Sequence, residues 1–141
     1  MNAVTLDQFT AMERARAWAA RHNLTVYKTA YKVAQSVPHI ELHFVTPQVA
    51  KRHLDLIAQL SAEIGLPVTY ATEPKPAYMS EMLASILPPS WNVSKSHSLM
   101  KEAGQFVIKA FGAANLPRQE VEDVRAKFAE MTGYMLVVHE A

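Results

Sequence analysis

The sequence predicts an α+β fold made of two similar lobes, each a small three-stranded sheet covered by helices. The first observation is that the order helix, strand, strand, helix, strand occurs twice along the 141 residues. The second is that equivalent landmarks keep a nearly constant offset, 66 residues from Ile40 to Phe106 and 68 from Gly65 to Gly133. The third is the composition: half of the residues are hydrophobic, and 14 basic residues balance 13 acidic ones. Such a composition is typical of a folded domain.

The first lobe is expected to begin with a helix and a hairpin. Helix-forming residues run from Leu6 to His22, and Asp7 is a suitable N-cap. Polar and apolar residues alternate over 25–33 and again over 39–45, which is the period of a half-exposed strand. A turn is expected between the two strands, over residues 35–38.

A second helix and a short strand complete the first lobe. Thr46 before a proline is a helix-start signature, so one helix is expected over 47–64. Gly65 is the expected stop of that helix. Residues 66–70 form a short apolar strand, and 71–76, with two prolines in six residues, predict a linker.

The second lobe repeats this order. Helices are expected over 76–87 and 117–132, and strands over 91–99, 105–111 and 134–138.

The expected division of the chain is therefore 1–72 for the first lobe and 73–141 for the second. A unit of about 67 residues buries only about 60% of the surface of its unfolded chain. The two lobes are therefore expected to pack as one compact body.

Composition excludes several classes of protein. The net charge of +1 and the pI of about 8.0 give no overall attraction to nucleic acid or to an anionic membrane, so any basic surface must be local. Without cysteine there is no disulfide scaffold, thiolate zinc site, iron–sulfur cluster or cysteine nucleophile. The sequence has no signal peptide and no apolar stretch of about 18 residues, which predicts a cytoplasmic protein without a membrane partner.

Catalytic patterns are missing as well. The chain has four glycines and lacks a nucleophile elbow, a phosphate loop and a dinucleotide fingerprint, so we expect no enzyme activity and no cofactor. His39, Glu41 and His43 alternate along one strand face and would suit a divalent metal ion. Neighbours in such a series lie about 7 Å apart, which is wide for one ion. We therefore interpret them as the solvated face of the hairpin, and no metal site is assigned.

Basic residues concentrate in the first lobe and indicate a phosphate-binding surface. Lys28 and Lys32 share one strand face, while Lys51 and Arg52 lie in the first turns after the Thr-Pro helix start. Arg118 is the nearest equivalent in the second lobe. Cations that neutralise backbone phosphates supply most of the affinity for nucleic acid. These five residues are therefore the candidate nucleic-acid-binding set.

An apolar stripe on the helix over 76–87 offers an alternative. Tyr78, Met79, Met82 and Ile86 recur at helical spacing and could dock a partner helix. This favours a protein-interaction or oligomerisation domain that does not bind nucleic acid. The sequence leaves the oligomeric state open.

The repeated element order resembles a reduced KH domain of the prokaryotic type. Two segments, AQLSAEIGLPVTY and AKFAEMTGYMLVV, are similar to the helix-glycine-strand ending of KH repeats. The segment HIELHFVTPQVAKRHLDLI also resembles the KH-like N-terminal domain of the bacterial replication initiator DnaA.

Neither half contains the GxxG loop that clamps a nucleic-acid backbone in true KH domains. Residues 45–48 occupy that place in the first half and residues 112–115 in the second. The resemblance implies a degenerate KH-like tandem. It also implies a non-catalytic module associated with single-stranded nucleic acid, such as part of a larger replication, transcription or RNA-processing protein.

Overall fold

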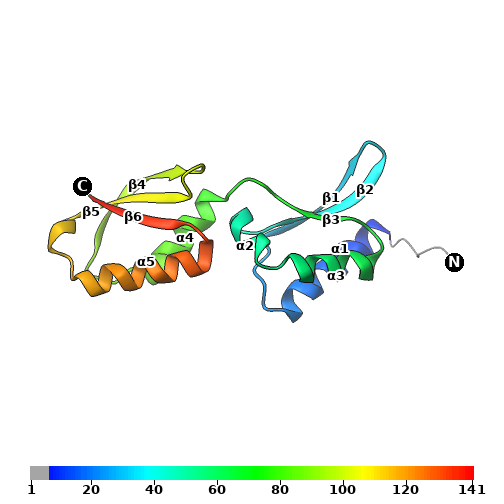
Figure 1. Cartoon of the computed structure of the whole chain (residues 1–141), viewed down its shortest axis with the longest axis horizontal. Helices are drawn as coiled ribbons and strands as arrows, with labels where there is room; N and C mark the ends of the chain where they lie inside the picture. Colours follow the sequence, from blue (N-terminus) through cyan, green and yellow to red (C-terminus); the bar gives the residue numbers. More distant parts are fainter. Residues whose placement is uncertain (1–6) are drawn as a thin grey trace. The chain divides into compact units, whose positions relative to one another are not determined.

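The computed structural model describes residues 7–141 and divides the chain into two compact units. Unit 1 ends at Pro74 and unit 2 runs from Lys75 to Ala141, so the boundary lies inside the proline-rich segment 71–76. Each unit has one three-stranded sheet with helices packed on it (Figure 1). The predicted α+β fold with two similar lobes is thereby confirmed. In the part of the chain that the structure describes, no helix is long and apolar enough to cross a membrane.

Unit 1 pairs its strands in the order β1-β2-β3, antiparallel between β1 and β2 and parallel between β2 and β3. The helices α1 and α3 cover one face of this sheet (Figure 1). In chain order the elements are α1 (Gln8–Arg21), β1 (Lys28–Ala34), β2 (Val37–His43), α2 (Pro47–Lys51), α3 (Leu54–Ile64) and β3 (Val68–Tyr70).

The core of unit 1 lies between this sheet and its helices. Ile40 and Leu42 of the central strand are fully buried, and the register places Tyr31 and Val68 beside Ile40 on the same face. Small residues on α1 let the helix approach the sheet closely. The buried residues of this core are Ala11, Ala15, Trp18, Ala19, Ile40, Leu42, Phe44, Ala50, Ile57, Leu60, Ile64 and Leu66.

Local signals set the ends of these elements as the sequence predicts. The Asp7 carboxylate caps α1 by accepting the Thr10 N–H at 2.9 Å; the expected start at Leu6 lies outside the described residues. Gly65 ends α3 in the left-handed conformation, with φ of 73°. The hairpin turn is shorter than the expected 35–38, because Val37 and Pro38 already belong to β2. It is formed by Gln35 and Ser36, whose φ angles of 51° and 64° fit a two-residue turn that follows strand twist.

The single helix expected over 47–64 is wrong. Two helices occupy this range, because the chain leaves helical geometry at His53, whose φ and ψ are −125° and 28°. The Arg52 and His53 N–H groups bond to the carbonyls of Val49 and Ala50, three residues back, which tightens the last turn of α2. The His53 ring then stacks on the buried Phe44 with ring centroids 6.3 Å apart.

Unit 2 repeats this topology, with strand order β4-β5-β6, antiparallel then parallel. Its core includes Phe106 and Phe128, whose ring centroids are 5.4 Å apart, and the Trp91 indole N–H donates to Glu120 of α5. The elements are α4 (Pro76–Ile86), β4 (Asn92–Met100), β5 (Gln105–Phe111), a 3-10 turn η1 (Ala113–Asn115), α5 (Arg118–Thr132) and β6 (Met135–Glu140) (Figure 1).

Candidate nucleic-acid interface

One face of the unit 1 sheet lies opposite the face that α1 and α3 cover (Figure 1), and Lys28 and Lys32 lie on it. Lys28 pairs with His43 across the two antiparallel strands, and Lys32 pairs with His39. Since directly paired residues point to the same side of a sheet, all four share a face with Glu41. The buried Ile40 and Leu42 point to the opposite side.

The Glu41 carboxylate pairs with two basic side chains on this face, Lys32 and His43. It lies 2.9 Å from the Lys32 ammonium and 2.8 Å from Nε2 of His43. Burial raises the pKa of Glu41, but the hydrogen bond and charge of Lys32, together with His43, outweigh burial and hold it below its ordinary value. Lys32 is therefore already paired, whereas Lys28 is exposed and has no acidic partner among residues 7–141.

The predicted solvated character of the His39, Glu41 and His43 series holds only in part. His43 is only 9% exposed, and the side chain of Glu41 is 18% exposed. The contact between Glu41 and His43 explains why these two side chains tolerate burial. Across the described part of the chain, no group of three such side chains is placed to hold a metal ion.

Lys51 and Arg52 lie side by side at the break between α2 and α3. Lys51 is the last residue of α2 and Arg52 is its C-cap, and both side chains are exposed. The tight turn sends His53 inward onto Phe44. The break thus presents two consecutive cations on the surface.

An apolar groove of about 620 Å³ begins next to these cations. Its first residue, Leu54, is 51% exposed and follows Arg52 by two positions. The groove runs between α3 and the edge strand β3 and includes the half-buried ring of Tyr70. Sequence reasoning missed this groove because it forms only when α3 packs beside β3. The one signal was the short apolar strand directly after the Gly65 stop.

Arg118 belongs to unit 2, where it is the first residue of α5 and is exposed. Nearby basic and acidic groups are paired with one another, since the Arg125 guanidinium lies 3.4 Å from Glu122 and also donates to the Leu136 carbonyl. The candidate cations are therefore distributed over two units, with Lys28, Lys32, Lys51 and Arg52 in the first.

The residues expected to dock a partner lie on α4. Met79 is fully buried, so it contributes to the core and offers no accessible contact. Tyr78, Met82 and Ile86 are half-buried. The accessible part of the expected stripe is thus smaller than its helical spacing suggests.

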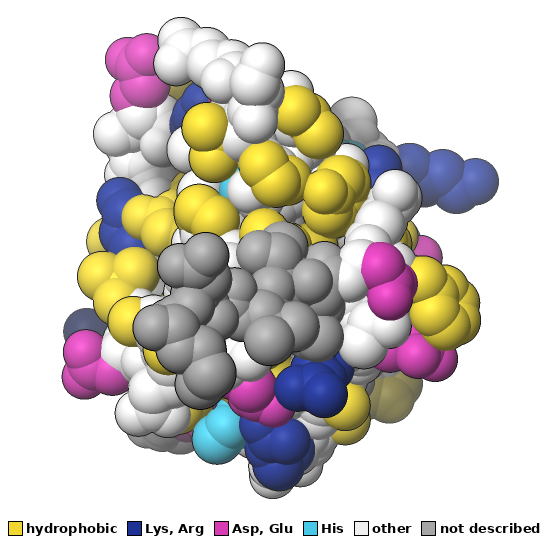
Figure 2. All heavy atoms as spheres, turned by 90° about the vertical axis from the view of Figure 1, so that its right-hand side faces the viewer, with side chains coloured by type: hydrophobic (Ala, Val, Ile, Leu, Met, Phe, Trp, Pro, Cys, Tyr) yellow, Lys and Arg dark blue, Asp and Glu magenta, His cyan; other side chains and the backbone are white. Residues whose placement is uncertain are grey.

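Exposed apolar side chains occur elsewhere in unit 1. Val33 and Val37 flank the hairpin turn and are both more than half exposed. Figure 2 faces the end of unit 1 that holds this hairpin and shows hydrophobic side chains gathered on its upper half. Charged side chains surround them in the same view.

Comparisons with known proteins give little guidance. No protein-family model matches the chain, and no curated protein matches its sequence. A solved structure described as "Crystal structure of APE1850" is 15% identical, with a match that covers 96% of this chain and 100% of the other, and its TM-score is 0.34. The function is therefore inferred from the geometry of this chain alone.

Proposed function

We propose that the chain binds single-stranded nucleic acid through unit 1 without catalysing a reaction on it. The observation that carries this proposal is the position of Lys51 and Arg52. These two exposed cations stand at the break between α2 and α3, where the apolar groove along β3 begins.

Each part of this surface suits a different part of a nucleotide. The ammonium and guanidinium groups pair with successive backbone phosphates and release counterions. The apolar walls at Leu54 and Val68 and the ring of Tyr70 accept the flat face of an unpaired base. A base inside a duplex is stacked on its neighbours, so this combination favours single strands.

The charge available limits the affinity. Lys32 is held by Glu41, so the exposed cations of unit 1 assigned to the site are Lys51, Lys28 and Arg52, of which Arg52 also interacts with another residue of the chain. Two or three phosphate contacts give binding that is weak at physiological salt and stronger at low salt.

The test is a fluorescence-anisotropy titration of the full chain with mixed-sequence single-stranded RNA and DNA. We expect Lys51→Glu/Arg52→Glu to weaken binding by at least about tenfold, because two phosphate contacts are lost and two repulsions are added. The matched control, Arg14→Glu/Lys127→Glu, makes the same change in net charge at two exposed helical positions outside the site. Equal loss in both variants would show that only overall charge matters and would refute the site.

A second candidate function, self-association or protein binding, is favoured by unit 2. Its sheet has a face turned away from Phe106 and Ile108, and the register places Met100, Met135 and Phe111 on that face, all about half exposed. Sedimentation equilibrium at increasing concentration tests this candidate. A constant monomer mass, together with no change for Met100→Lys/Met135→Lys, would remove it.

A further inference from the structure

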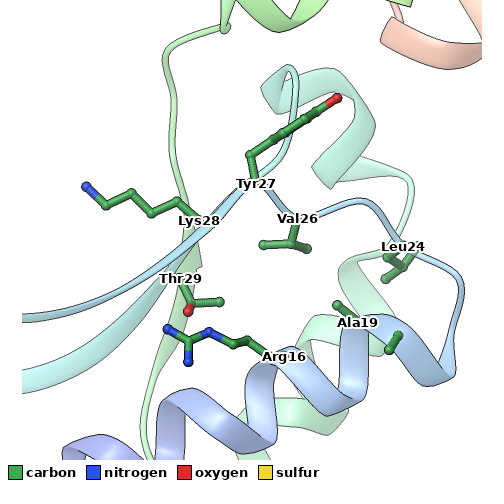
Figure 3. A pocket seen from close by; sticks show the side chains of 8 residues that line it. Arg16, Ala19, Leu24, Val26, Tyr27, Lys28 and Thr29 are labelled. Atoms are coloured by element: carbon green, nitrogen blue, oxygen red, sulfur yellow. The ribbon is translucent and has the colours of Figure 1, made fainter.

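Unit 1 contains another cavity, of about 410 Å³, apart from the groove along β3. It lies between the C-terminal half of α1 and the chain that leads into β1 (Figure 3). Lys51, Arg52 and the groove along β3 do not line it. Of the cations assigned to the proposed interface, its lining includes Lys28 alone.

The cavity contains a buried hydroxyl that the protein leaves unpaired. Thr29 is 7% exposed and its Oγ1 has no hydrogen-bond partner among the described residues. Its pairing with Leu42 places it on the helix-covered side of the sheet, where it lines the cavity. A buried hydroxyl without a partner is unfavourable for folding, and most such groups in native proteins are satisfied. A partner from outside the chain would explain this one.

A guanidinium group stands beside that hydroxyl. Figure 3 shows the Arg16 side chain reaching from α1 toward Thr29, whereas Lys28 points away. Arg16 is exposed and forms no ion pair with any residue in 7–141. The planar guanidinium offers two parallel N–H donors, which match the two oxygens of a carboxylate or a phosphate.

Apart from Tyr27 and Lys28, the rest of the lining is apolar. Ala19 of α1 and Leu24 and Val26 of the following segment form that side of the cavity (Figure 3). An inorganic ion alone would leave this surface without contacts. The lining instead fits a compact hydrophobic body that carries its charge at one end.

We propose that this cavity binds a small oxyanion joined to a compact apolar body. The oxygens of the ligand accept hydrogen bonds from the Arg16 guanidinium and the Thr29 hydroxyl, and its apolar part packs on Ala19, Leu24 and Val26. The shared ligand chemistry is a carboxylate or a phosphate ester.

The test is an NMR titration of the full chain, in which backbone amide shifts are followed with three compounds of similar shape. Benzoate carries a carboxylate, phenyl phosphate carries a phosphate ester, and benzamide is neutral. We expect saturable shifts at the amides of Ala19, Val26 and Thr29 with at least one anion, and at least about tenfold weaker binding of benzamide. The anion that binds more tightly identifies the oxyanion class.

Two single substitutions distinguish binding in this cavity from nonspecific binding of anions at the protein surface. Thr29→Val keeps the shape of the side chain and removes only the unpaired hydroxyl, so the fold is retained and the anion binds about tenfold more weakly. Arg16→Gln has the same effect on binding, whereas the control Arg14→Gln, on the same helix but outside the cavity, leaves it unchanged. Absence of saturable shifts, equal binding of benzamide, or unchanged affinity in Thr29→Val and Arg16→Gln would overturn the proposal. We expect Lys51→Glu/Arg52→Glu to leave anion binding in the cavity unchanged. The cavity proposal and the nucleic-acid proposal can therefore fail independently of each other.

Discussion

At the scale of single residues, the pairing of charges decides which cations can meet a ligand. Strand alternation correctly predicts that Lys28 and Lys32 share a face. It does not predict that Glu41 holds Lys32, because that contact runs diagonally between strands and depends on the register of the hairpin. The sequence therefore predicts which side chains on this face are basic. It does not predict which of them are already paired with an acidic side chain.

The Lys32, Glu41 and His43 contacts make stability depend on pH. Because the pKa of Glu41 is lowered in the folded state, its stabilisation is fully present above the ordinary value of 4.5 and is lost as the pH falls through the lowered value. We expect Glu41→Gln to destabilise the protein near neutral pH, and the difference from wild type to shrink as the pH falls below 4.5. Urea denaturation at several pH values measures this difference.

Glu13→Gln is the control, since Glu13 is exposed and makes no ion pair within the described range. A Glu41→Gln difference that stays constant with pH would show that the carboxylate charge is not responsible.

At the scale of elements, strong local signals predicted where helices end and where the chain turns. Tertiary packing determined the break between α2 and α3. Gly65 and Gly133 end α3 and α5 as expected, because a left-handed C-cap favours glycine. The break between α2 and α3 has no such signal. The sequence QVAKRHLDL contains neither glycine nor proline, and the interruption coincides with His53 stacking on Phe44, a tertiary contact.

The hairpin turn stores strain that a substitution can relieve. Gln35 and Ser36 both hold positive φ, which costs a residue with a side chain about 1 kcal/mol or more. We expect Gln35→Asn/Ser36→Gly to raise the free energy of unfolding by about 1 kcal/mol, because Asn-Gly is the preferred pair for this turn. Thermal denaturation followed by circular dichroism checks it, with Ser36→Ala as a control that retains the side-chain carbon. No gain in stability would mean that the turn is not strained.

At the scale of the whole molecule, one topology occurs twice but the two units present different chemistry after their central strands. In unit 1 this region leads to Lys51 and Arg52. In unit 2 the Glu140 carboxylate accepts the N–H groups of Gly112 and Ala113, at 3.2 and 2.6 Å. A carboxylate at this place satisfies the backbone donors and repels phosphate.

This difference gives a prediction for Arg118, which follows the Glu140-bound turn. We expect Arg118→Glu to weaken nucleic-acid binding by less than about twofold, because an exposed cation near several carboxylates adds little. The anisotropy titration used for unit 1 measures it. A loss as large as that of Lys51→Glu/Arg52→Glu would show that both units contact the strand.

The duplication itself was predictable because proline, glycine and alternating strands recur at nearly constant offsets. The groove beside β3 and the cavity at Thr29 were not predictable. Each depends on how a helix packs against the strand that follows it, which the order of the elements does not specify.

The most direct test of phosphate binding at the α2–α3 break is the salt dependence of affinity for single-stranded nucleic acid. Each phosphate contact contributes about 0.7 to the slope of log affinity against log salt concentration. We expect Lys51→Glu/Arg52→Glu to reduce that slope by about 1.4, corresponding to two lost contacts. An unchanged slope, or wild-type binding that does not weaken as salt is raised, would contradict the proposal.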